Sequence, residues 1–355
     1  MKLPAVNDVI GPLAAIVILS SLLTGCVTLN PEDLSPSDFR QKYCSGSKFN
    51  LDVDGDQISV HYRDEGSGPV LILLHGVCDS LHTWDDWKEE LKDDFRIIRC
   101  DFPPFGLTGS FDDRQISEPR WLAFIDAFLD ELGIEQAMFA GNSLGGGLAW
   151  RYASSRPERV EKLVLLDPPG FVLRKELPLE LKAARAKPVA KFLRRVMPEP
   201  GWKLVINRLY RGGVLRSFPR DAELQEQRCR EDAERFYDLS NLKENRNEYL
   251  HVFEELFEIS ANENYETIGA RIERIEAPIL LLWGADDPWF PPSAPKGNGK
   301  TELELWAKYV RTALTIVVYE DVGHMPQRQI PKMSAADARR FLLGNRLSEE
   351  APSAE

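Results

Sequence analysis

The sequence is short of positive charge and of histidine. Its 44 lysine and arginine residues are outnumbered by 56 aspartate and glutamate residues, which gives a net charge of −12 at pH 7. That balance argues against a general nucleic-acid-binding role, which calls for a basic surface. The five histidines are scattered without metal-ligand spacing, so we expect no metal site, and no pattern calls for another cofactor.

A long hydrophobic run is also lacking. Residues 9–23 form an apolar stretch of the length of a secretory signal, too short for a comfortable membrane span. It ends at Leu23-Thr24-Gly25-Cys26, which resembles the lipobox of bacterial lipoproteins. This pattern predicts a signal peptide over residues 1–25, acylation of Cys26 and a polar tether over residues 26–47. We therefore expect a lipoprotein held by its acyl chains at a membrane of the bacterial cell envelope, facing the periplasm or the cell surface. An uncleaved hydrophobic anchor is the alternative.

Cysteine is sparse as well. Once Cys26 is acylated, four cysteines remain, and an exported protein permits disulfides among them. The sequence does not select one of the three connectivities that four cysteines allow. Cys78 and Cys100 lie near predicted strand ends, where a buried thiol equally serves as a small apolar side chain.

Apolar runs typical of strands alternate with amphipathic helical segments along most of the chain. The patterns predict a hairpin and further strands at residues 49–53, 58–62, 70–74, 95–100, 136–140, 160–166, 279–283 and 314–319. Helices are predicted at residues 79–91, 121–132 and 144–156. This alternation predicts an α/β fold with a doubly wound, mostly parallel sheet that binds ligands at the carboxyl ends of its strands.

One connection is too long for a simple crossover. About a hundred residues separate the strand at 160–166 from the strand at 279–283, far more than a crossover needs. We predict that residues 171–275 form an inserted helical cap over the strand ends. The folded core then consists of residues 48–170 and 276–345, and residues 346–355 form a flexible tail.

The segment 139–147, Phe-Ala-Gly-Asn-Ser-Leu-Gly-Gly-Gly, places Gly-x-Ser-x-Gly between a strand and a helix. In that context the motif is a nucleophile elbow, where the serine occupies a strained turn and the glycines let strand and helix approach closely. The helix N-terminus beside the serine favours developing negative charge. We therefore predict that Ser143 is a nucleophile. The alternative is an ordinary glycine-rich turn.

Other strand ends supply partners for this serine. Gly323-His324 follows the last predicted strand, and acidic residues follow the strand before it, so a serine, an acid and a histidine occur in a known triad order. We predict that His324 is the general base. His75-Gly76 ends the strand at 70–74, and we expect the backbone N–H groups of Val77 and Leu144 to form an oxyanion hole. For the side chain of His75 we expect a structural role.

Taken in chain order, these motifs resemble the α/β-hydrolase fold family, in its serine esterase and carbon–carbon-bond hydrolase branch. The resemblance spans residues 48–344 and rests on His75-Gly76, Asp101-Phe102-Pro103-Pro104-Phe105-Gly106, Gly141-Asn142-Ser143-Leu144-Gly145-Gly146, Trp283-Gly284-Ala285-Asp286-Asp287 and Gly323-His324. The family's Trp-Gly-x-x-Asp pattern implies that Asp287 is the triad acid. Asp286 beside it and Asp167 after the strand at 160–166 are the alternatives.

The resemblance implies hydrolysis of a small-molecule carboxylic ester without a metal. His324, oriented by Asp287, would accept the proton of Ser143 as its hydroxyl attacks the ester carbonyl, and water would hydrolyse the acyl-enzyme. Cleavage of a carbon–carbon bond in a vinylogous diketone is the alternative, because the same elbow sequence occurs with both chemistries. A different class is a catalytically silent binding protein on this scaffold. The sequence does not predict the oligomeric state.

Overall fold

The computed structural model describes residues 35–43, 46–171, 223–242 and 263–344, together with residues 245, 248 and 252. The predicted signal peptide (1–25), Cys26, the tail (346–355) and most of the predicted cap (171–275) lie outside the described residues. Within the described ranges, no helix combines the length and the apolarity needed to cross a membrane.

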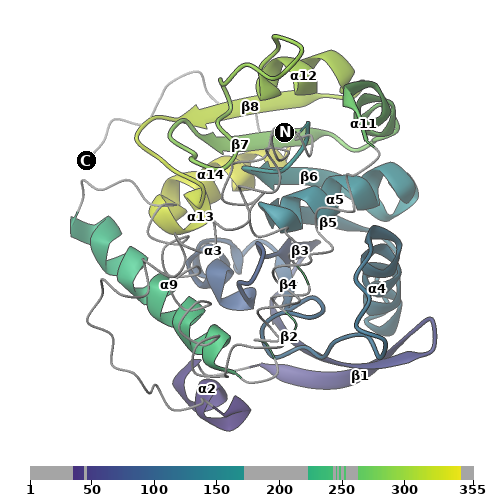
Figure 1. Cartoon of the computed structure of the whole chain (residues 1–355), viewed down its shortest axis with the longest axis vertical. Helices are drawn as coiled ribbons and strands as arrows, with labels where there is room; N and C mark the ends of the chain where they lie inside the picture. Colours follow the sequence, from purple (N-terminus) through teal and green to yellow (C-terminus); the bar gives the residue numbers. More distant parts are fainter. Residues whose placement is uncertain are drawn as a thin grey trace, which may run out of the picture.

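Eight strands form one sheet in the order β1-β2-β4-β3-β5-β6-β7-β8 (Figure 1). The first two strands are the predicted hairpin, and β2 also pairs antiparallel with β4, whereas the remaining neighbours pair parallel. The predicted mostly parallel sheet is therefore confirmed. The strand bounds are β1 (Ser47–Val53), β2 (Asp56–Gly66), β3 (Val70–Leu74), β4 (Arg96–Cys100), β5 (Ala137–Asn142), β6 (Val160–Leu166), β7 (Ile279–Gly284) and β8 (Leu314–Tyr319).

The central strands are apolar on both faces. In β7, Ile279, Leu281 and Trp283 join one hydrophobic core, while Leu280 and Leu282 join the other, and all five are buried. A continuous apolar run is what a strand covered by helices on both faces requires. The sheet therefore separates two cores.

Helices cover both faces of this sheet (Figure 1). One core is closed by α4 (Glu118–Glu131), α5 (Leu144–Ser155), α11 (Tyr265–Ile272) and α12 (Glu302–Tyr309). The other is closed by α3 (Asp85–Leu91) and α14 (Pro331–Leu342). The helix predicted at 79–91 is in fact the 3₁₀ helix η1 (Leu81–Trp84) followed by α3, and the shorter elements η2 (Pro157–Arg159) and α13 (Pro326–Gln329) complete this part.

The segment before β1 is not only a tether. Residues Pro36–Tyr43 form α2, in which Ser35 and Asp38 exchange hydrogen bonds at the first turn. Phe39 is completely buried, and Lys42 Nζ and Tyr43 Oη each contact Asp238 of α9 (Glu223–Asn241) at 2.7 Å. The polar tether expected over residues 26–47 is therefore wrong over this stretch, because its aromatic side chains find buried partners remote in sequence.

The boundary predicted for the cap is also wrong at its C-terminal end. Helix α11 lies within residues 171–275, but its Ile268 and Ile272 are buried in the same core as α5 and α12. A helix in this place is the crossover that a parallel connection into β7 needs. Helix α9, by contrast, lies outside the sheet, beside α2 and close to α13 (Figure 1).

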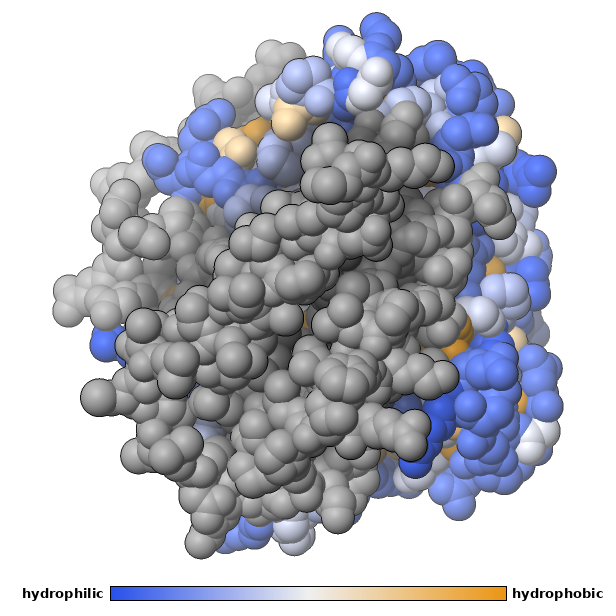
Figure 2. Space-filling model, viewed as in Figure 1, coloured by the Kyte–Doolittle hydropathy of each residue, from blue (hydrophilic) through white to orange (hydrophobic). Residues whose placement is uncertain are grey.

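The described surface is mainly hydrophilic where Figure 2 colours it. Among the described residues, Val318 and Leu343 are the only exposed large hydrophobic side chains.

Candidate active site

Ser143 occupies the turn between β5 and α5. Its backbone has φ 51° and ψ −121°, a conformation that a residue with a Cβ adopts only at an energetic cost. Two backbone hydrogen bonds of 2.9 Å hold it there: its N–H donates to the carbonyl of Leu166, and its own carbonyl accepts from Gly147. The predicted strand and helix are thus present, with the serine at the strained turn between them.

Two glycines allow this turn to be so tight. A Cβ on Gly141 would lie 2.4 Å from the carbonyl oxygen of Gly145, and a Cβ on Gly145 would lie 2.2 Å from that of Leu74. Neither backbone oxygen can move away cheaply. The first turn of α5 therefore lies directly against β3 and β5, and its N-terminus begins at Ser143.

His324 and Asp287 meet at the ends of the last two strands. His324 Nδ1 lies 2.9 Å from Asp287 Oδ2, and Asp287 Oδ1 accepts hydrogen bonds from the backbone N–H groups of Trp289 and Phe290 at 2.8 and 3.2 Å. Burial alone would raise the pKa of Asp287, but His324 and these N–H groups hold that pKa below its usual value. An ionised Asp287 keeps a proton on Nδ1 and leaves Nε2 of His324 able to accept one.

Asn142 brings the histidine loop to the elbow. Its side-chain Nδ2 donates to the carbonyl oxygen of His324 at 2.9 Å and to that of Leu166 at 3.2 Å. Because Asn142 precedes Ser143 directly, these bonds fix the backbone of the predicted base next to the predicted nucleophile. Sequence reasoning assigned Asn142 no role. The available signal was an amide side chain in an otherwise apolar strand, where burial demands hydrogen-bond partners.

The three candidate acids are placed differently. Asp286 is exposed, whereas Asp287 is buried and contacts His324. Asp167 is fully buried at the end of β6, and its Oδ1 accepts a hydrogen bond from the N–H of Gly284 at 3.0 Å. Burial, and next the neighbouring Asp287 carboxylate, raise the pKa of Asp167 well above its usual value.

Asp167, Asp287 and His324 offer donor atoms that lie within 4.8 Å of one another, close enough to share a metal ion. The hydrogen bond between His324 and Asp287 already accounts for two of these groups, and a raised pKa makes Asp167 a poor anionic ligand. The residues thus fit an oriented base better than a metal centre. The expected lack of a cofactor stays a prediction.

The loop after β3 passes next to Ser143. A Cβ added to Gly76 would lie 3.5 Å from the Cβ of Ser143, and Val77 follows directly. Leu144 is the first residue of α5, so its N–H has no partner within the helix. Both predicted oxyanion donors thus belong to segments that border the serine, and their role stays a prediction.

His75 has the structural surroundings expected for it. Its ring is fully buried and stacks on Phe102, with ring centroids 4.3 Å apart. Nδ1 lies 2.7 Å from the carbonyl oxygen of Gly76, and Nε2 accepts the N–H of Phe102 at 3.3 Å. Burial lowers the pKa of His75, in keeping with a neutral ring that donates once and accepts once.

Residues 69–328 match the family model described as the alpha/beta hydrolase fold. The chain belongs to this family. Its members named below are hydrolases, so the expectation of a hydrolytic enzyme is confirmed, and the alternative of a catalytically silent binding protein is not supported.

Individual relatives refine this placement. The chain is 30% identical over 271 residues to the 2-hydroxy-6-oxononadienedioate/2-hydroxy-6-oxononatrienedioate hydrolase of Burkholderia vietnamiensis, covering 69% of this chain and 81% of that protein. It is 25% identical over 295 residues to the hydrolase of the same name from Klebsiella pneumoniae, and the match covers 81% of this chain and 92% of that protein. A solved meta-cleavage product hydrolase from Pseudomonas fluorescens IP01 superposes with a TM-score of 0.64 at 22% identity, covering 85% and 99%, which shows the shared fold.

These names correct one expectation. A plain carboxylic ester hydrolase was expected, but four of the curated sequence relatives are named as hydrolases of 2-hydroxy-6-oxo acids and not as esterases. The expectation of an ester substrate is therefore wrong, and the carbon–carbon alternative agrees with the relatives. The error has a physical source: attack on an ester carbonyl and attack on a ketone carbonyl both need a nucleophile, a base and oxyanion donors, so these residues do not distinguish the two substrates.

Proposed function

We propose that this protein hydrolyses a carbon–carbon bond in a 2-hydroxy-6-oxo-dienoate, whose keto form is a vinylogous diketone. The similarity to hydrolases named for such acids carries the proposal. A 2-hydroxy-6-oxononadienedioate contains two carboxylates, an enol and a ketone, but no ester or amide bond. Hydrolysis of such a compound therefore has to break a bond between carbon atoms beside the ketone.

The arrangement of Ser143, His324 and Asp287 supplies the groups that this reaction needs. His324 Nε2 accepts the hydroxyl proton of Ser143 while Oγ attacks the ketone carbon, and Asp287 stabilises the resulting imidazolium. The N–H groups of Val77 and Leu144 stabilise the tetrahedral oxyanion. Collapse of this intermediate breaks the carbon–carbon bond and leaves an acyl group on Ser143.

The bond that breaks joins two carbons, so the departing carbon takes an electron pair. Conjugation with the distant carbonyl has to stabilise that negative charge. The electron pair of the broken bond passes along the enone to its distant carbonyl oxygen, which takes up the proton held by His324. Water then attacks the acyl-enzyme with His324 as base. The balance is one substrate and one water giving a carboxylic acid and a 2-hydroxydienoate.

The test is turnover of 2-hydroxy-6-oxonona-2,4-dienedioate, followed by the loss of absorbance of its conjugated system and by mass spectrometry of both products. Ser143→Ala should abolish turnover and labelling by a fluorophosphonate with little change in Tm, whereas Ser155→Ala, at an exposed serine ending α5, should behave as the native protein. Fluorophosphonate labelling of Ser143 without any dienedioate cleavage would contradict the substrate class while leaving the serine mechanism standing.

We further propose that the enzyme is a lipoprotein acylated at Cys26 after removal of residues 1–25, and thus anchored in a membrane of the bacterial cell envelope. The apolar stretch at residues 9–23 and the Leu-Thr-Gly-Cys sequence after it support this proposal. Cys26 lies outside the described residues, and α2 begins ten residues after it at Pro36.

A further inference from the structure

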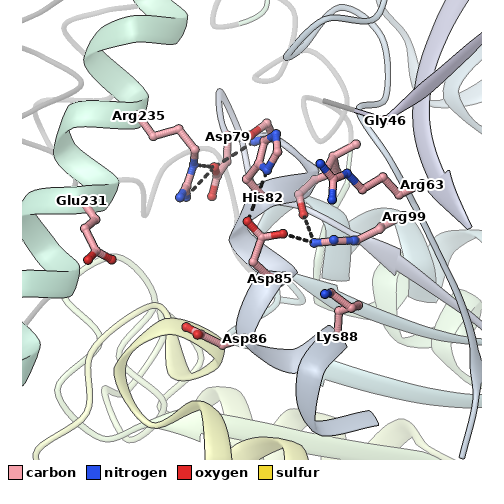
Figure 3. Close-up of polar contacts among 12 residues, drawn as sticks. Gly46, Arg63, Asp79, His82, Asp85, Asp86, Lys88, Arg99, Glu231 and Arg235 are labelled. Carbon is pink, nitrogen blue, oxygen red and sulfur yellow. Dashed lines mark hydrogen bonds and ion pairs between the residues drawn. The ribbon is translucent and has the colours of Figure 1, made fainter. Parts of the chain in front are cut away.

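A series of buried ion pairs links helix α9 to two loops of the active site. Figure 3 shows Arg235 extending from α9 to Asp79 on the loop after β3. Asp79 Oδ1 accepts from Arg235 Nη2 at 3.1 Å and from Nε at 3.3 Å, and Arg235 Nη1 lies 2.7 Å from Asp232 Oδ1. Asp232 in turn lies 2.9 Å from Nε of Arg328. All four side chains are more than nine-tenths buried.

The first end of this series lies on the predicted oxyanion loop. Asp79 comes two residues after Val77, and its N–H points back to the carbonyl oxygen of Gly76 at 3.4 Å. Its carboxylate also accepts the N–H of Ser80 at 2.8 Å. Cys78, between Val77 and Asp79, has a φ of 60°. The loop is therefore held in a backbone conformation that costs energy and that only fixed neighbours can maintain.

The other end lies on the segment that carries the base. Arg328 belongs to α13, which begins two residues after His324, and its N–H donates to the carbonyl of Met325 at 2.9 Å. The next residue, Gln329, accepts the N–H of Gly323 at 2.9 Å through its side chain. The residues on either side of His324 are thus fixed to the same short helix as Arg328.

Stability alone does not require such an arrangement. Two carboxylates and two guanidinium groups are removed from water here, and apolar side chains of similar volume often stabilise a fold as well or better. Such ion pairs do fix the positions of the groups that they join. The planar guanidinium of arginine holds its N–H donors in a rigid arrangement, so it accepts only a few placements of its carboxylate partners.

We propose that α9 acts as a clamp. Its Arg235 binds Asp79 and its Asp232 binds both Arg235 and Arg328 of α13, and these contacts hold the oxyanion loop and the base loop in their catalytic positions. Both arginines are positioning residues, because they act through Val77 and His324 and touch no reacting atom. The inference rests on the proposed serine mechanism but not on the identity of the substrate. Arg235 is the better site to test, since Arg328 is also held by Asp86 of α3 at 2.6 Å.

The experiment compares three variants by the rate constant for fluorophosphonate labelling of Ser143 and by Tm. Arg235→Met alone leaves Asp79 buried without its cation, so both the Tm and the labelling rate should fall. The double variant Asp79→Asn/Arg235→Met removes one charge of each sign and should recover most of the Tm, while labelling remains at least tenfold slower than native. Glu234→Gln, on the exposed side of α9, is the control and should label at the native rate.

The clamp proposal would be overturned if the double variant recovered the native labelling rate as well as the native Tm. Charge balance would then be the only role of the Asp79–Arg235 pair. Should Arg235→Met fail to fold, the double variant alone decides by the same criterion. With the dienedioate as substrate, the double variant should lose kcat at least tenfold and keep KM within about threefold. A native protein that does not label would instead contradict the serine mechanism, and the two failures are thereby distinguished.

Discussion

Asp286 and Asp287 are neighbours in sequence with opposite surroundings. Asp287 is buried against His324, and Asp286 is exposed. Asp287→Asn should lower kcat by roughly a thousandfold or more, because an amide does not stabilise the imidazolium and favours the wrong tautomer. Asp286→Asn should keep near-native kcat. Steady-state kinetics on both variants checks this assignment, and a large loss in Asp286→Asn alone would reverse it.

Asp167 adds a second buried carboxyl group beside the proposed triad. Its pKa is raised, so the folded protein retains a proton there that the unfolded chain releases above about pH 4. Between the pKa of Asp167 in the unfolded chain and its raised pKa in the folded protein, the native state binds more protons than the unfolded state. The free energy of unfolding therefore falls as pH rises through this interval. Asp287 has a lowered pKa and acts in the opposite sense, as its stabilising contribution is lost when pH falls.

Asp167→Asn removes the first of these titrations and keeps the size of the side chain. Relative to the native protein, the variant should gain free energy of unfolding as pH rises above about pH 4, by at most about 1.4 kcal/mol per pH unit. Urea denaturation at several pH values measures the difference. If the substitution also costs a hydrogen bond, the free energy of unfolding changes by the same amount at every pH. A difference in free energy of unfolding between variant and native protein that stays constant from pH 4 to pH 8 would therefore show that Asp167 does not hold its proton.

At the scale of single elements, α2 makes the clearest prediction. Phe39 is completely buried, with its ring centroid 4.5 Å from that of Tyr43 and 6.3 Å from that of His82. Phe39→Ala should lower the free energy of unfolding by about 3 kcal/mol through lost burial and the cavity left behind. Arg40→Ala, at an exposed position of the same helix, should change it little. Urea denaturation separates the two, and equal stability of both variants would mean that α2 does not dock.

The sequence predicts the elements that depend on local patterns. The apolar runs of β3, β6 and β7 and the Gly-x-Ser-x-Gly turn lie where they were expected. Such signals are contained within about ten residues, so they are visible without any knowledge of tertiary contacts.

The features that the sequence does not reveal depend on partners far apart in the chain. Arg235 and Asp79 are 156 residues apart, Tyr43 and Asp238 are 195 apart, and Asn142 and His324 are 182 apart. No local period encodes such a contact. A charged residue in an amphipathic helix such as α9 is therefore expected in water, and its burial against an opposite charge emerges only from the fold.

On the scale of the whole molecule, the proposed active site draws on residues that are far apart in the chain. Ser143 follows β5 in the middle of the sheet, the proposed acid and base follow β7 and β8, and α2 and α9 lie together outside the sheet (Figure 1). Helix α9 thus contacts α2 through Asp238, the loop after β3 through Arg235, and α13 through Asp232. Contacts therefore run from α2 through α9 to Asp79 and Arg328.

The proposed lipid anchor would lie close to α2 along the chain. Ten residues lead from Cys26 to Pro36, so α2 would lie within roughly 35 Å of the membrane surface. Cys26→Ser should shift the protein from the membrane fraction to a soluble or unprocessed form, because Cys26 is the proposed site of acylation. Cys44→Ser, a cysteine close by in the sequence, is the matched control and should remain in the membrane fraction. Fractionation combined with the mass of the N-terminal peptide measures both. Unchanged membrane association of Cys26→Ser with an intact Met1 would instead identify residues 9–23 as an uncleaved hydrophobic anchor.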